Sequence, residues 1–252
     1  MTLRERCELL RSLHVSGRPL VLPNAWDAAS ARAVEAAGFP AVATTSAGVA
    51  EALGYADHEE APAEEMVAAA ARVVRAVGVP VTVDFEAGYG LAPEALVEAL
   101  AGAGAAGCNL EDTDHAAGAV RDRADGAIRL AAIREAAEAR GYPLVVNARV
   151  DVFLLDGGKT PEAELVDEAI ARGTAYLEAG TDCVYPILAR ERDTIARLVE
   201  RVGGPVNVLA HPDAPSLAEL AALGVARVSH GPFLFRRVMA QLDAWLAQEG
   251  RL

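Results

Sequence analysis

The 252-residue sequence lacks several features that mark common classes of protein. Its net charge of −13 leaves no general surplus of positive charge, which argues against binding nucleic acid or an anionic membrane through a broad basic surface. No apolar run approaches the roughly 20 residues that are needed to span a bilayer. We therefore expect no nucleic-acid partner and no membrane partner, while a local arginine pocket would still accept a small anion.

Cysteine is also scarce. Cys7, Cys108 and Cys183 lie far apart in the sequence and form neither a CxxC pair nor a metal-binding cluster. They are expected to be buried thiols in a reducing cytoplasm. The N-terminal segment MTLRERCELLRSLHVSG has periodic leucines with charges between them, which predicts an amphipathic helix and not a signal peptide.

The sequence does contain a regular alternation of short apolar runs and longer stretches of helical period. Hydrophobic residues make up 52% of the chain, enough for a substantial core. Strands are predicted at 19–25, 40–46, 79–86, 107–112, 142–151, 181–187, 205–210 and 226–231. Helices are predicted near 27–37, 62–77, 93–103, 127–140, 161–179, 190–201, 215–223 and 233–248. A glycine precedes most of the strands, as at a helix C-cap.

Eight strand-then-helix units predict an α/β fold of the (β/α)8 TIM-barrel type. A doubly wound open sheet, which uses the same alternation, is the second candidate. No composition break or long linker divides the chain, so residues 1–252 are interpreted as a single α/β-barrel domain. Two segments, 47–61 and 113–126, are too long for short connections and are predicted to be loops on the strand C-terminal side, where barrel sites and lids are found.

Polar residues gather where the predicted strands end, whereas glycine, proline and aliphatic residues stand where they begin. In the segment VTVDFEAGYG, Asp84 and Glu86 are two residues apart, so on a strand they would share one face. With Glu111 on the next strand, three acids would repel unless a cation lies between them, and a hard divalent ion is the usual one. Arg149 could pair with Glu111, but its planar fork also suits a substrate carboxylate or phosphonate.

Other acids at the strand ends have a simpler interpretation. Asp27, Asp112 and Asp151 stand where helix caps and Asx-turns favour aspartate.

The segments PNAWDAASARAVEAAGFPAVATTSAGVAEALGYAD, DFEAGYG, NLED and NARVD, in this order, resemble the isocitrate lyase/phosphoenolpyruvate mutase superfamily. The likeness runs from about Val21 to Phe235. It implies an α/β barrel whose last helix is exchanged between subunits of a homodimer or homotetramer. It also implies Mg²⁺, with Mn²⁺ as a substitute, and small 2-oxo acid or dicarboxylate substrates.

The resemblance also implies roles for individual residues. Asp84 corresponds to the principal metal-linked carboxylate, which Glu86 and Glu111 join through water. Thr45, Ser46 and Ala47 match the segment that holds the 2-oxo acid end of the substrate. The side chains expected to be catalytic are Asp57, Glu111 and Arg149. The residues expected to bind substrate are Asn24, Thr45, Ser46, Ala47, Asp84, Arg149 and Asn207. The residues expected to hold the metal are Asp84, Glu86 and Glu111.

The sequence departs from the family pattern in the parts that select the reaction. The isocitrate and methylisocitrate lyases carry a cysteine-containing loop after the fourth-strand acid, but here the region reads EDTDHAAGAVRD. The mutases and phosphonopyruvate hydrolases carry a lysine and an asparagine in that loop, where Ala117 and Ala119 stand. Ile187 replaces a glutamate expected after the sixth strand.

The resulting hypothesis is a Mg²⁺-dependent lyase that cleaves a C–C bond, or decarboxylates, a small 2-oxo or 2-hydroxy di- or tricarboxylate through an enolate-type intermediate. Two alternatives remain open. One is a mutase or hydrolase of a P–C bond in a phosphonopyruvate-like substrate, and the other is a non-catalytic 2-oxo acid binding protein.

Overall fold

The computed structural model describes residues 1–249, in which helices and strands alternate along the chain. The strands of the parallel ladders are β1 (Leu20–Leu22), β2 (Asn24–Ala25), β3 (Val42–Thr44), β4 (Val81–Asp84), β5 (Gly107–Glu111), β8 (Val145–Val150), β9 (Cys183–Pro186), β10 (Asn207–Leu209) and β11 (Arg227–Ser229). The helices are α1 (Leu3–Ser12), α2 (Ala28–Ala36), α3 (Ser46–Leu53), α4 (Ala63–Ala76), α5 (Pro93–Ala103), α6 (Arg123–Ala139), α7 (Val152–Asp156), α8 (Glu162–Glu178), α9 (Arg192–Arg201), α10 (Leu217–Ala222) and α11 (Phe233–Glu249).

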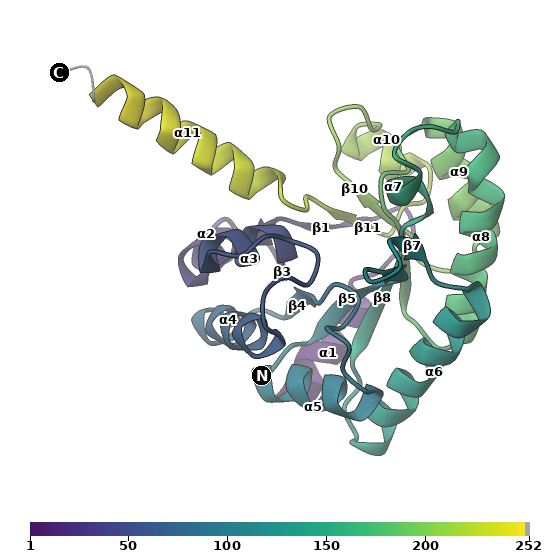
Figure 1. The fold of residues 1–252 in the computed structure, drawn as a ribbon, viewed down its shortest axis with the longest axis horizontal. Helices are drawn as coiled ribbons and strands as arrows, with labels where there is room; N and C mark the ends of the chain where they lie inside the picture. Colours follow the sequence, from purple (N-terminus) through teal and green to yellow (C-terminus); the bar gives the residue numbers. More distant parts are fainter. Residues whose placement is uncertain (250–252) are drawn as a thin grey trace.

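The strands pair in two parallel ladders, in the orders β2-β3-β4-β5-β8-β9 and β1-β11-β10. β1 and β2 are successive segments of one extended stretch, interrupted at Pro23, which has no N–H to donate to a ladder. The two ladders also meet between β9 and β10. There, Val184 forms a β-bridge with Val206, and the N–H of Val184 donates to Pro205 O at 2.9 Å. The arrangement, with helices around the parallel strands in Figure 1, is the predicted α/β fold of the TIM-barrel type.

Helix α1 covers the ends at which the strands begin. Its Cys7 and Leu10 are buried, and its Arg11 donates to Asp182 (2.7 Å) and to Leu144 O (3.1 Å), just before β9 and β8. The amphipathic helix predicted at the N-terminus is therefore confirmed, as are the buried thiols. With one end of the strands covered in this way, a site is to be sought at their carboxyl ends.

The predicted strands all exist, but each observed strand is shorter than its prediction. The segment 47–61 is not entirely a loop, because most of its first half belongs to α3, which ends at Gly54 in a left-handed conformation (φ 93°). The segment 113–126 begins as an antiparallel hairpin of β6 (Thr113–Asp114) and β7 (Ala119–Val120) and then enters α6.

Helix α11 extends away from the other elements in Figure 1. Its first turn is anchored by Phe235, which is buried and packs edge-on against Trp26 with 5.3 Å between ring centroids. Farther along, Val238, Leu242, Trp245 and Leu246 are large apolar side chains that are exposed.

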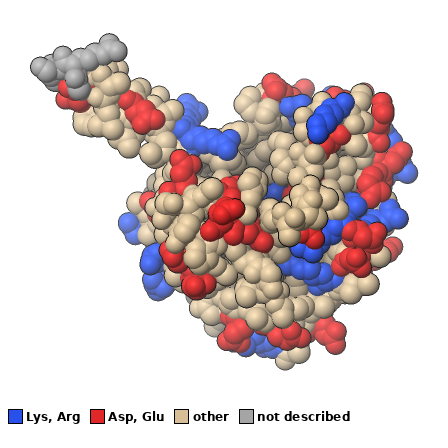
Figure 2. Space-filling model, viewed as in Figure 1, with Lys and Arg blue, Asp and Glu red and all other residues tan. Residues whose placement is uncertain are grey.

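The surface carries both signs of charge. Figure 2 shows acidic and basic side chains interspersed over the face in view, with several acidic side chains gathered near its centre. Among residues 1–249, no helix is both long enough and apolar enough to cross a membrane.

Candidate active site

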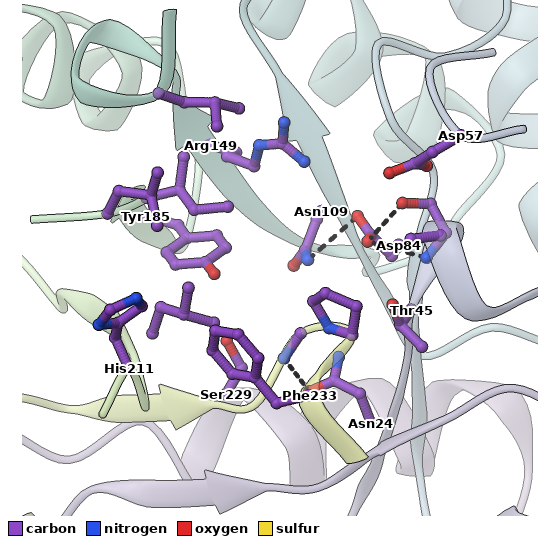
Figure 3. A pocket seen from close by; sticks show the side chains of 18 of the residues that line it. Asn24, Thr45, Asp57, Asp84, Asn109, Arg149, Tyr185, His211, Ser229 and Phe233 are labelled. Atoms are coloured by element: carbon purple, nitrogen blue, oxygen red, sulfur yellow. Dashed lines mark hydrogen bonds between the residues drawn. The ribbon is translucent and has the colours of Figure 1, made fainter. Parts of the chain in front are cut away.

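A cavity of about 370 Å³ opens at the carboxyl ends of the strands (Figure 3). It is lined by Asn24, Thr45, Ser46, Ala47, Asp57, His58, Asp84, Asn109, Arg149, Leu154, Tyr185, Ile187, Leu188, Leu209, His211, Ser229, Gly231, Pro232, Phe233 and Arg236. Six of the seven residues that were predicted to bind substrate line this cavity, whereas Asn207 does not.

Asp84 is the last residue of β4, and its carboxylate is held from two sides. Oδ2 accepts hydrogen bonds from the backbone N–H and the hydroxyl of Ser46, both at 3.0 Å, at the N-terminus of α3. Oδ1 accepts from Asn109 Nδ2 at 3.3 Å. The helix N-terminus and the amide donor together fix the position of this carboxylate.

Asp57 comes from the loop after α3, and Figure 3 shows its carboxylate on the same side of the cavity as Asp84. Its Oδ1 atom is buried and has no hydrogen-bond partner within residues 1–249. A buried carboxylate oxygen without a partner is costly, and a cation or a ligand donor would satisfy it.

Glu86 does not face the same way as Asp84, which corrects the reasoning from strand alternation. β4 ends at Asp84, and Glu86 adopts a left-handed conformation with φ 45°. Its carboxylate turns to the backbone N–H of Glu59 (2.7 Å) and to the hydroxyl of Tyr89. Burial, with repulsion from Asp57 and Asp84 as a further cause, raises the pKa of Glu86 to about 7. Glu86 is therefore a neighbour of the cavity wall and not part of it.

Glu111 lies at the end of β5, buried, between Arg149 and His115. Its carboxylate oxygens are 2.6 Å from Arg149 Nη1 and 2.8 Å from His115 Nε2. Burial raises the pKa of Glu111, while Arg149 opposes that shift. Like Glu86, it is not part of the cavity wall.

Arg149 reaches the cavity from β8, but it is not a free clamp. Its Nε and Nη2 atoms donate to the two carboxylate oxygens of Asp151 at 2.6 and 2.8 Å, and Nη1 pairs with Glu111. Three of its five N–H groups are thus used within the protein, and its charge is balanced by two buried carboxylates. The face of the guanidinium that was predicted to bind the substrate binds the carboxylate of Asp151 instead. Two N–H groups of Arg149 remain for a ligand.

Asn24 and Asn207 have internal partners. Asn24 lines the cavity, but its Nδ2 donates to Thr44 O (2.6 Å) and its Oδ1 accepts from the N–H groups of His230 and Gly231, at 2.8 and 2.9 Å. Asn207 is fully buried, donates to Ser229 Oγ at 3.2 Å and does not line the cavity. It is the first residue of β10, whereas the cavity is lined by the last residue of that strand, Leu209.

The three aspartates interpreted as caps fall into two groups. Asp27 caps α2, because its Oδ1 accepts from Ser30 N at 2.7 Å. Asp112 instead pairs with Arg172 at 3.1 Å, and Asp151 pairs with Arg149, so both are buried ion-pair partners.

Among residues 1–249, no group of three or more His, Cys, Asp and Glu side chains is arranged to hold a metal ion. Asp84, Glu86 and Glu111 are therefore not brought together as direct ligands. The donor set still suits Mg²⁺, which typically takes one or two carboxylates and retains several waters. Asp84 and Asp57 supply two carboxylates at one side of the cavity, and one oxygen of Asp57 is unpartnered.

The structure adds wall residues that were not selected from the sequence: His58, Asn109, Leu154, Leu188, Leu209, Gly231, Pro232, Phe233 and Arg236. Asn109 could have been found, because it lies two residues before Glu111 on the same predicted strand. Arg236 carried no such signal, since it belongs to the first turn of α11 beyond the last strand. Its side chain is exposed at the cavity, without a carboxylate partner in the described part of the chain.

Comparison with known proteins identifies one family. Residues 10–248 match the family model described as phosphoenolpyruvate phosphomutase. The 2,3-dimethylmalate lyase of Eubacterium barkeri is 31% identical over 253 residues, which cover 94% of this chain and 84% of the lyase. An oxaloacetate decarboxylase of Bradyrhizobium sp. (strain BTAi1) is 31% identical over 245 residues, which cover 92% of this chain and 81% of the decarboxylase. A crystal structure of a phosphonomutase-like protein from Burkholderia cenocepacia J2315 superposes with a TM-score of 0.92 at 43% identity, covering 98% of this chain and 99% of that one.

Proposed function

Because this chain belongs to the isocitrate lyase/phosphoenolpyruvate mutase superfamily, we propose that it is a Mg²⁺-dependent lyase that cleaves a C–C bond, or decarboxylates, a small 2-oxo or 2-hydroxy dicarboxylate. The observation that carries the proposal is the charge pattern of the cavity. The carboxylates of Asp57 and Asp84 lie on one side, and the cations Arg149 and Arg236 also belong to the wall. The names of the relatives, 2,3-dimethylmalate lyase and oxaloacetate decarboxylase, support a dicarboxylate substrate.

Asp84 and Asp57 would hold the Mg²⁺ ion, and Glu86 and Glu111 would act through water. When bound, the ion would polarise the 2-oxo group and stabilise the negative charge that develops on it as the bond breaks. Mn²⁺ takes the same oxygen ligands and is expected to substitute. The repulsion between Glu86 and the two aspartates, which raises the pKa of Glu86, is what a nearby cation would relieve.

The 2-oxo acid end of the substrate would lie against the start of α3. Thr45, Ser46 and Ala47 line the cavity there, and the free N–H groups of a helix N-terminus bind carboxylates. Because Ser46 already donates to Asp84, the start of α3 would orient both the Asp84 carboxylate and the substrate.

The other carboxylate of the substrate needs a cation. Arg149 offers two remaining N–H groups but little net charge, since Asp151 and Glu111 compensate it. Arg236 has no such partner within residues 1–249 and therefore supplies the stronger attraction at the mouth of the cavity. The chain's net charge of −13 repels anions at long range, so this local cation matters for binding.

The proposal is tested by incubating the purified protein and Mg²⁺ with oxaloacetate, 2,3-dimethylmalate, 2-methylisocitrate and phosphonopyruvate, and identifying the products by mass. Cleavage or decarboxylation of one of the three carboxylic acids without phosphorus that stops on addition of EDTA, and that is absent in Asp84→Asn, supports it; if 2-methylisocitrate is the one cleaved, the substrate class extends to tricarboxylates. Saturable binding of a 2-oxo acid without turnover of any of the four compounds would instead favour a non-catalytic binding protein.

Chemistry at a P–C bond is the second candidate. The family model and the phosphonomutase-like structure favour it. Against it, Ala117 and Ala119 stand on the β6–β7 hairpin where, by resemblance, the mutases carry lysine and asparagine. Release of phosphate, or formation of phosphoenolpyruvate, from phosphonopyruvate would establish it.

A further inference from the structure

A fully buried arginine lies inside the strands beneath the cavity. Arg227, the first residue of β11, has no exposed surface. Its Nη2 donates to Asn109 Oδ1 at 3.1 Å, whereas Nε and Nη1 have no hydrogen-bond partner, and it forms no ion pair with any of residues 1–249. A buried guanidinium without a carboxylate costs free energy of folding, so a role other than stability is to be sought for it.

Arg227 is connected to Asp84 through one amide. The registers of β4, β5 and β8 align Asp84, Asn109 and Asn147 in a row across the three strands. Asn109 Oδ1 accepts from both Arg227 Nη2 and Asn147 Nδ2, the latter at 2.8 Å. On its other side, Asn109 Nδ2 donates to Asp84 Oδ1, the bond drawn in Figure 3.

The direction of these bonds follows from the chemistry of arginine. A guanidinium has five donors and no acceptor, so the amide group that faces it must be the carbonyl oxygen. The NH₂ group of Asn109 must then face Asp84. Without Arg227, only the long bond to Asp84 and the Asn147 amide, which can itself rotate, would oppose a half-turn of the Asn109 amide. After such a turn the amide oxygen would meet the carboxylate as one acceptor against another.

We propose that Arg227 is a positioning residue for Asp84: it fixes the orientation of the Asn109 amide, which in turn donates to the Asp84 carboxylate. Ser46 holds one oxygen of Asp84 from α3. The hydrogen bonds from Arg227 to Asn109 and from Asn109 to Asp84, which we call the relay, hold the other oxygen from the interior of the barrel. Arg149 cannot take this role, because its guanidinium is already paired with two carboxylates, those of Glu111 and Asp151. The consequence for metal and 2-oxo acid binding rests on the function proposed above.

The substitution Arg227→Met tests the inference because it keeps an unbranched side chain of four heavy atoms and removes the guanidinium, with both its charge and its donors. The dissociation constant for Mg²⁺, measured by calorimetry without substrate, is expected to rise about 10–100-fold, as for other groups that orient a metal ligand. The Tm is expected to stay the same or to rise, because an unpaired buried charge is replaced by an apolar group. A residue with a merely structural role would instead lower the Tm when removed.

Two further variants make the test specific. Asn109→Leu removes the amide itself, and its effect on Mg²⁺ affinity should not add to that of Arg227→Met, because both break one relay. Arg227→Lys keeps a donor and the charge, so it should restore part of the affinity. Arg201→Met, at an exposed arginine that pairs with Asp167, is the matched control and should change neither quantity.

Unchanged Mg²⁺ affinity in a folded Arg227→Met protein would overturn the inference. So would additive losses of Mg²⁺ binding free energy in the double variant that combines Arg227→Met with Asn109→Leu. If the wild-type protein binds no Mg²⁺, the proposed function fails instead, and the relay is then tested by the Asn109 side-chain amide in NMR spectra of the metal-free protein. Loss of its slow hydrogen exchange in Arg227→Met would support the relay. An amide signal that is the same in both proteins would refute it.

Discussion

Replacing Arg149 by lysine should lower both the stability of the fold and the affinity for a dicarboxylate. In the protein, the guanidinium makes three charge-assisted contacts, two with Asp151 at 2.6 and 2.8 Å and one with Glu111 at 2.6 Å. A lysine ammonium is a single point charge and cannot reproduce the fork on Asp151 while it also reaches Glu111. At least one buried carboxylate oxygen would then lose its partner.

The loss of one hydrogen bond to a charged group costs about 1.5–3 kcal/mol. For a chain of this size, each kcal/mol corresponds to a fall of about 2–4 °C in Tm, so a cost of about 2 kcal/mol predicts a fall of about 4–8 °C. Affinity for oxaloacetate should also weaken by about tenfold or more, because the two N–H groups left for a ligand would be displaced with the rest of the fork.

The two effects are measured separately, by thermal unfolding followed by circular dichroism and by calorimetric titration with oxaloacetate and Mg²⁺. Arg201→Lys, at a half-exposed arginine on α9, is the control and should leave both unchanged. An unaltered Tm in Arg149→Lys would refute the reasoning on the buried ion pairs. A lowered Tm with unaltered binding would show that Arg149 only supports the wall and does not contact the substrate.

Three other predictions concern the metal, the substrate and the assembly. Asp84→Asn should weaken Mg²⁺ binding by about tenfold or more while the circular dichroism spectrum is retained; equal affinity in a titration would contradict the metal assignment. Arg236→Gln should reduce affinity for oxaloacetate by about fivefold and leave pyruvate unaffected, which parallel binding assays can compare; equal losses for both acids would show that Arg236 does not read the distal carboxylate. The exposed apolar face of α11 is expected to pack on a second copy of the chain as a swapped helix, so light scattering should give a dimer or tetramer and Trp245→Asp should shift it toward monomer. A monomeric wild-type mass at micromolar concentration would count against the swap.

Much of the fold was predictable because its signals are local. Each predicted strand contains an observed one, since apolar runs followed by glycine-capped helices reflect backbone preferences that act over a few residues. The rim of the site was predictable for a related reason. In parallel α/β folds the carboxyl ends of the strands lie on one side, so polar residues at those ends must converge.

The errors arose where a local rule stopped applying. Asp84 and Glu86 would share a face on a continuous strand, but β4 ends at Asp84 and the chain turns through left-handed conformations at Glu86, Gly88 and Tyr89. Arg129 donates a hydrogen bond to the carbonyl of Ala87 in this turn, so the turn contacts a side chain more than 40 residues away in the sequence. Alternation alone could not indicate it.

The sequence by itself determined the order of the elements, the end of the strands that carries the site, and part of the cavity wall. The tertiary structure alone decided which partners the charged groups have: that Arg149 is occupied by Asp151 and Glu111, and that Arg227 is buried without a carboxylate and reaches Asn109, 118 residues away. The physical reason is the distance along the chain over which each kind of interaction acts. Backbone propensity and hydrophobic period act between neighbours in the chain, whereas the hydrogen bonds and ion pairs that set the charge of a site depend on distances that exist only after the strands have been brought together.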